Sequence, residues 1–168
     1  MTAKQDERDA LTAFLQAQRR SVLAIVEGLA ERDMRRPVVH SGWTPLGMIE
    51  HLGHAEHFWF KQVVTGTADP LGEPPRAEAR ADHGPFVTSR PVHDVLAFYR
   101  EQVVRSDEIL AATPLDSRPA GRIPPDMAAE IHTVRDVVLH MVEEVARHAG
   151  HLDIARELLD GETGLGPR

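Results

Sequence analysis

The chain has 168 residues, a formal net charge of −7 and no cysteine. A chain of this length fits one domain that buries about 70% of the surface of its unfolded form, and the lack of cysteine excludes disulfides, thiolate metal ligands and a cysteine nucleophile. The negative charge and the scattered arginines argue against nucleic acid as the main partner, because neutralising phosphates requires concentrated basic residues.

The N-terminal segment MTAKQDERDA is charged and has no apolar signal core. No run of residues approaches the roughly 20 apolar residues that a membrane span requires. We therefore expect a cytoplasmic protein that has no membrane partner. Residues 1–168 are expected to form a single domain, with residues 162–168 as a flexible tail.

Apolar residues recur at helical spacing in four stretches, and no stretch alternates as a strand does. The sequence therefore predicts an all-α fold, a four-helix bundle with long crossover loops. The first helix is expected from about Asp6 to Glu31. Its inward seam consists of Leu11, Leu15, Gln18, Val22, Ile25 and Leu29.

The second helix is expected from Thr44 to Val64. Thr44 suits the N-cap, Pro45 suits the first helical position, and Gly66 suits the stop. The inward seam of this helix consists of Met48, His51, Ala55, Phe58 and Gln62. A histidine thus lies in line with the residues that should face the core.

Two long connections flank the third helix, which is expected from near Pro91 to about Ala112 with Ser89 as the capping candidate. The first, residues 65–90, is rich in proline and glycine, and a connection of this length usually crosses a bundle end or covers a site. The second, residues 113–130, contains further prolines, which predicts at least one long crossover. Two solvated surface loops would explain the same composition.

The fourth helix is expected to begin at Thr133, with Asp136 as the partner in a capping box, and to stop at Gly161. Its inward seam consists of Val134, Val138, Met141, Val145, His148, Leu152, Ala155 and Leu159. A neighbouring seam consists of Val137, Met141, Glu144, His148, His151 and Ala155. The longest predicted helix therefore carries a carboxylate and two imidazoles on a stripe that should otherwise be apolar.

These polar groups predict a metal site. Burying Glu144, His148 and His151 without a partner is costly, and a divalent cation compensates that cost. Glu144 and His148 are one helical turn apart, and His51 offers a third ligand from the second helix. A lone buried histidine is more often hydrogen-bonded than ligating, but chance does not readily place three such groups inward. His140, one turn before Glu144, stays open as an outer-shell group, a substitute ligand or a surface histidine.

The segments SGWTPLGMIEHLGHAEHFWF and VLHMVEEVARHAGHLDIARELLDG resemble the DinB/YfiT-like superfamily and, within it, the mycothiol-dependent transferase branch. Similarity to the related mycothiol-dependent maleylpyruvate isomerases implies His51, Glu144 and His148 as the metal ligands. Other members use three histidines, with the middle one at the position of Glu144. The resemblance implies a low-molecular-weight thiol such as mycothiol as partner, and relatives that look dimeric suggest a homodimer.

The resemblance also concerns three residues near the end of the fourth helix. Many superfamily members have glutamine at the position of His151, so this residue is expected to touch substrate or an outer-shell water rather than the metal. Asp153 and Arg156 match positions typical of the transferase branch, which makes them candidates for substrate binding. Ordinary intrahelical or surface roles are the competing interpretation for both.

Three protein ligands leave one position of a tetrahedral ion open, as in catalytic zinc sites. Zinc is the expected metal, and nickel, cobalt or iron would fit the same donors. A thiol in that position would lose its proton and attack an electrophilic small molecule, which predicts a transferase of detoxification or stress response. A metal-dependent small-molecule hydrolase and a non-catalytic metal-binding stress protein are the alternatives. The chain lacks HExxH and paired ExxH segments, which excludes a zincin peptidase and a ferritin-like di-iron bundle.

Overall fold

The computed structural model describes residues 3–68 and 86–163. Throughout these residues the regular structure is helical and contains no strand, which confirms the all-α prediction. The expected tail at 162–168 falls mostly outside the described residues, as does most of the first long connection. The elements are α1 (Ala3–Val26), α2 (Glu31–Met34), α3 (Pro45–Glu56), the π-helical η1 (His57–Val64), α4 (Val92–Ala112) and α5 (Val134–Asp160).

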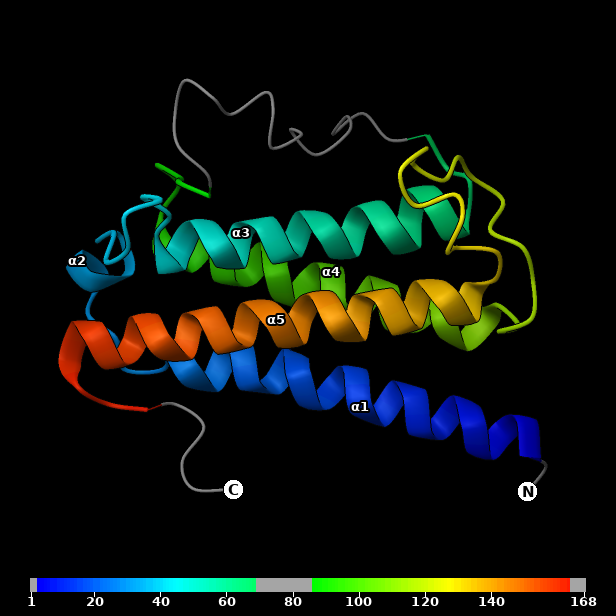
Figure 1. Ribbon diagram of the computed structural model, residues 1–168, viewed down its shortest axis with the longest axis horizontal. Coiled ribbons are helices and arrows are strands. Elements are labelled where there is room, and N and C mark those ends of the chain that lie inside the picture. Colours follow the sequence, from blue (N-terminus) through cyan, green and yellow to red (C-terminus); the bar gives the residue numbers. More distant parts are fainter. Residues whose placement is uncertain (1–2, 69–85, 164–168) are drawn as a thin grey trace.

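Four long rods lie side by side, with η1 continuing the rod of α3 (Figure 1). α1 packs mainly on α5, α3 packs mainly on α4, and α3 also contacts α5. α1 and α5 run in one direction, whereas α3 and α4 run in the other (Figure 1). Because consecutive α3 and α4 are parallel, the bundle has a crossover connection rather than simple hairpins. None of the described helices is long and apolar enough to cross a membrane.

The ends of the helices follow local capping chemistry. At the start of α3, the Thr44 hydroxyl accepts a hydrogen bond from the Gly47 N–H at 3.1 Å, as an N-cap does. At the start of α5, Thr133 and Asp136 form the predicted capping box. α5 ends at Gly161, whose φ of 82° is the left-handed conformation typical of a helix stop. The predicted ends of the second and fourth helices are therefore confirmed.

Two predicted boundaries are wrong. α1 ends at Val26, before the expected Glu31, because Gly28 has a φ of 74° and the chain then begins the separate helix α2. Ser89 does not cap α4; Pro91 occupies the cap position, and no side chain makes a capping hydrogen bond there. The proline itself separates loop from helix, because its fixed φ suits the entry to a helix.

The core forms along the predicted seam of α5, from Val134 to Ala155. On α3 and η1 the buried stripe differs from the prediction, since Phe58 and Gln62 are only half-buried whereas Leu52, Trp59 and Val63 are buried. The π-helical turn of η1 shifts the face that a regular α-helix would present. The seam was therefore predicted well only as far as Ala55.

A buried ion pair joins α1 to the end of α3. Arg19 Nε and Nη2 donate hydrogen bonds to the two carboxylate oxygens of Glu56, at 2.7 and 2.5 Å. The remaining guanidinium nitrogen, Nη1, donates a hydrogen bond to Asp107 Oδ1 on α4 at 2.7 Å. Arg19 is 2% exposed and Glu56 is fully buried, so these charges compensate each other inside the bundle.

Candidate metal centre

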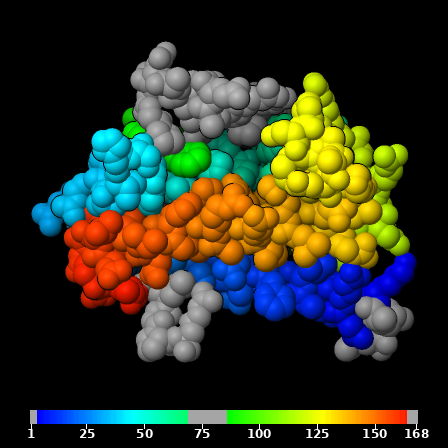
Figure 2. All heavy atoms as spheres, in the orientation of Figure 1, coloured from blue at the N-terminus to red at the C-terminus, as the bar shows by residue number. Residues whose placement is uncertain are grey.

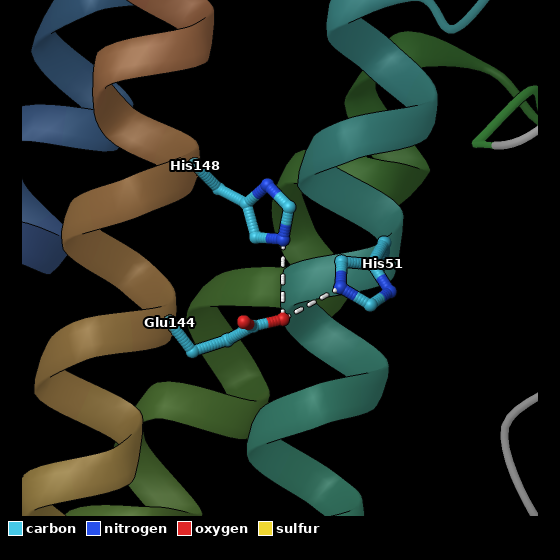
Figure 3. A group of neighbouring side chains, drawn as sticks. All are labelled: His51, Glu144 and His148. Carbon is cyan, nitrogen blue, oxygen red and sulfur yellow. Dashed lines mark hydrogen bonds and ion pairs between the residues drawn. The ribbon is translucent and has the colours of Figure 1, made fainter. Parts of the chain in front are cut away.

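Three polar side chains meet where α3 packs across α5. His51 extends from α3, and Glu144 and His148 extend from consecutive turns of α5 (Figure 3). One carboxylate oxygen, Glu144 Oε1, lies 3.0 Å from His51 Nε2 and 3.1 Å from His148 Nε2. The predicted juxtaposition of these residues from two helices is therefore present in the fold.

The donor atoms of this group fit one divalent cation. The two imidazole nitrogens and the carboxylate oxygen lie within 4.8 Å of one another. Ligand atoms bound tetrahedrally to zinc at its usual bond lengths lie about 3.3 Å apart, which is close to the 3.0 and 3.1 Å between the carboxylate oxygen and the two nitrogens. Mixed nitrogen and oxygen donors suit zinc as well as other first-row metals. We call His51, Glu144 and His148 the donor group.

The donor group is largely shielded from water. The side chains of His51, Glu144 and His148 are 20%, 15% and 10% exposed. Burial by itself raises the pKa of Glu144, but hydrogen bonds from His148 and His51 outweigh burial and hold that pKa well below its ordinary value. Glu144 is therefore a carboxylate at neutral pH, as a metal ligand must be.

With the geometry established, comparison with known proteins identifies the family. A family model described as mycothiol-S-transferase matches residues 10–161. The chain belongs to the mycothiol-S-transferase family. The match includes all three residues of the donor group and confirms the resemblance found in the sequence. No curated protein and no solved structure matches the chain.

In this member of the mycothiol-S-transferase family, His151 contacts His148 of the donor group. Its Nδ1 lies 3.3 Å from Nδ1 of His148, the ring nitrogen that faces away from Glu144. Metal-binding histidines commonly use the second ring nitrogen for such an orienting hydrogen bond. Burial, and then the neighbouring His148, lower the pKa of His151. His151 is exposed, so its predicted place on the inward stripe of this helix is wrong: the buried face of α5 turns away from it after His148. His151 is outside the donor group, and its contact with substrate stays a prediction.

The other sequence candidates are not members of the donor group. His140 packs its ring on Trp59, with centroids 4.5 Å apart, and burial lowers its pKa. Arg156 is buried and donates hydrogen bonds to the carbonyl oxygens of Ile25 and Glu27, both at 2.8 Å, which ties α5 to the end of α1. Asp153 is half-buried on the same helix. Substrate binding by Asp153 and Arg156 stays a prediction.

Sequence reasoning missed one residue at the site. The ring of Phe86 lies 4.2 Å from that of His51 and 5.8 Å from that of His148, measured between centroids. The green segment that begins at Phe86 lies between the cyan segment before α3 and the orange part of α5 (Figure 2). No periodic pattern singles out a residue in this loop. The only signal was the length of the connection, which indicated that it could cover a site.

Proposed function

We propose that the protein is a metal-dependent transferase that activates a low-molecular-weight thiol, mycothiol or a close analogue, for attack on an electrophilic small molecule. The observation that carries the proposal is the convergence of His51, Glu144 and His148 in a chain of the mycothiol-S-transferase family. Zinc is the proposed metal, because its preferred ligands include imidazole and carboxylate. Detoxification or stress response is the proposed setting.

The chain's own residues have separate tasks in this reaction. The donor group would hold the cation, with Glu144 supplying the negative charge and His151 orienting His148. A divalent cation in this place would keep a coordinated thiol deprotonated at neutral pH. The thiol sulfur then forms a bond to the electrophilic carbon. In a substitution, the bond to the leaving group breaks, that group departs with the electron pair, and the thiol proton goes to solvent. In an addition, one electron pair of the double bond moves to the neighbouring carbon, which takes up the proton that the thiol lost, by way of solvent.

A thiol suits this chain because the chain has no cysteine to act as nucleophile. The sulfur must come from a second substrate, which agrees with the description of the family. The same three donors would also serve a hydrolase that uses water. The two reactions differ in whether product forms without a thiol, so one assay separates them.

The test uses zinc-loaded protein, mycothiol and the fluorogenic electrophile monochlorobimane. We expect thiol-dependent formation of conjugate by the wild type and a loss of about a hundredfold or more in His51→Ala, with loss of bound zinc. His93→Ala is the matched control, because His93 is an exposed histidine on α4 that pairs with Asp94. Glu144→Gln and its neighbour Glu143→Gln form a second matched pair.

The alternatives give different results in the same experiment. Ester cleavage without thiol that depends on His51 would favour the hydrolase over the transferase. Binding of zinc by the donor group, with no turnover for any thiol tested, would favour a non-catalytic metal-binding protein. Full activity in both His51→Ala and Glu144→Gln would remove the donor group from the chemistry.

A further inference from the structure

Phe86 has an unusual backbone conformation that is held against the first turn of α3. It is the one non-glycine residue with positive φ in the described ranges, at 53°. A bulky residue adopts this conformation only when its surroundings hold it there, and such residues cluster at functional sites. Here the carbonyl oxygen of Phe86 accepts hydrogen bonds from the Thr44 backbone N–H at 3.1 Å and from the Thr44 hydroxyl at 3.4 Å.

Gly47 makes the close approach of Phe86 to α3 feasible. A Cβ atom at Gly47 would lie 1.7 Å from the carbonyl oxygen of Phe86 and 2.2 Å from its carbonyl carbon. Gly47 precedes His51 by one helical turn, so both residues lie on the same side of α3. The backbone of Phe86 therefore rests one turn from His51, and its ring extends over the His51 imidazole at 4.2 Å.

Apolar side chains also occur near His151, on α5 and in the segment before α3. The buried Trp43 lies 6.2 Å from the ring of His151, which in turn contacts His148. Ile154 and Leu158 follow His151 by three and seven residues on the same face of α5, and they are 56% and 57% exposed. An exposed apolar surface beside a polar site is typical of a place where a ligand binds.

We propose that Phe86 determines which electrophiles the protein accepts, by forming an apolar wall beside the donor group against which a planar, apolar electrophile stacks. The inference rests on the proposed function and names the substrate class for that same site. Stacking on Phe86 removes apolar area of both partners from water and adds a favourable ring contact. A charged or strongly hydrated electrophile loses water at this wall and gains no hydrogen bond in return.

The first test compares methyl, butyl and benzyl acrylate, which share one reactive group but differ in apolar area. In the reaction the thiol sulfur bonds to the β-carbon, the carbon–carbon double bond becomes single, and the α-carbon takes up the proton that the thiol lost. For the zinc-loaded wild type we expect KM to fall from methyl to benzyl acrylate. Phe86→Ala should raise KM for benzyl acrylate about tenfold and leave methyl acrylate nearly unchanged.

Two further variants separate the wall from a general effect on folding. Phe86→Leu keeps an apolar side chain without the ring, so its KM for benzyl acrylate should lie between those of wild type and Phe86→Ala. Phe14→Ala is the matched control, because Phe14 is a 64% exposed phenylalanine on α1. If Phe86→Ala changes KM for all three acrylates by the same factor, Phe86 has only a structural role and the proposal is wrong.

The second test does not depend on turnover. Benzyl and methyl propionate, the saturated esters, cannot accept a thiol, and their binding to zinc-loaded protein is measured by calorimetry. We expect benzyl propionate to bind the wild type about tenfold more tightly than Phe86→Ala, with Phe86→Leu between them and no change for methyl propionate. This result without thiol transfer would support the wall while refuting the proposed transferase. Equal affinity of the wild type and both Phe86 variants for benzyl propionate would overturn the wall.

Discussion

The cluster around Arg19 and the donor group both lie between the helices of the bundle, and they differ in how their charges are balanced. Around Arg19, three guanidinium nitrogens bond the carboxylates of Glu56 and Asp107, so cation and anions are both supplied by the chain. In the donor group, two imidazole nitrogens converge on one oxygen of Glu144. The only arginine close to that carboxylate, among the described residues, is the half-exposed Arg147 at 3.8 Å. The first cluster is complete as it stands, whereas the second has the arrangement of a site for an added cation.

The largest expected effect comes from breaking the complete cluster. Arg19→Met leaves Glu56 buried without its cation, which should lower the free energy of unfolding of metal-free protein by about 3–5 kcal/mol. Urea denaturation measures the change, with Arg20→Met as the exposed neighbouring control. The folded fraction of Arg19→Met should still bind zinc. A loss below about 1 kcal/mol would mean that the buried pair contributes little.

The donor group, unlike the Arg19 cluster, should stabilise the fold mainly when a metal ion is bound. Zinc at about a thousand times its dissociation constant should raise the free energy of unfolding of the wild type by about 4 kcal/mol. Glu144→Gln should lose most of this increment, while Glu143→Gln keeps it. The measurement is urea denaturation with zinc and with a chelator. An equal increment in both variants would show that zinc stabilises the fold from another place.

A smaller effect is expected at Gly121, in the loop before α5. This loop contacts η1, which continues the helix α3. The Gly121 N–H bonds the Val63 carbonyl oxygen at 2.9 Å, and a Cβ at Gly121 would lie 2.0 Å from the Gln62 carbonyl oxygen. Gly121→Ala should therefore destabilise the protein by about 1–3 kcal/mol without changing zinc affinity. Gly150→Ala is the control on α5, because a Cβ there meets nothing within 4 Å. This control should gain up to about 1 kcal/mol.

The smallest effect concerns the tyrosine beside the complete cluster. Tyr99 is fully buried, its hydroxyl has no hydrogen-bond partner in the described part of the chain, and burial followed by the nearby Glu56 raises its pKa. Tyr99→Phe removes a hydroxyl that bonds none of the described residues, so stability should change by less than about 1 kcal/mol or increase. Thermal denaturation provides the measurement. A loss above about 2 kcal/mol would reveal a hydrogen bond to an internal water.

The sequence predicted the elements whose signals are local. The Thr133 capping box, the Gly161 stop and the inward seam of α5 depend on residues a few positions apart, and periodicity correctly placed Glu144 and His148 on one stripe. The proximity of His51 to Glu144 and His148 could be inferred because the predicted inward seams of two helices both carried polar residues. Its ligation of a metal is still a prediction.

Features that depend on distant contacts could not be predicted. Arg19 lies next to the predicted seam, but nothing local indicates that Glu56, 37 positions away, balances its charge. Phe86 lies beside the donor group because its backbone has a positive φ and because Gly47 has no side chain to block it. Neither feature can be recognised from the spacing of apolar residues in the sequence. The π-helical η1 likewise shifted the buried face after Ala55, since the hydrophobic pattern was interpreted with α-helical spacing.

X-ray absorption spectroscopy of zinc-loaded protein tests most directly whether the three side chains bind one cation. We predict nitrogen and oxygen ligands at about 2.0–2.2 Å, with outer-shell scattering from two imidazoles. Once thiol is added, a sulfur ligand should appear at about 2.3 Å. In His148→Ala the signal of one imidazole should disappear. Zinc without imidazole scattering, or an unchanged spectrum in His148→Ala, would contradict a metal centre at His51, Glu144 and His148.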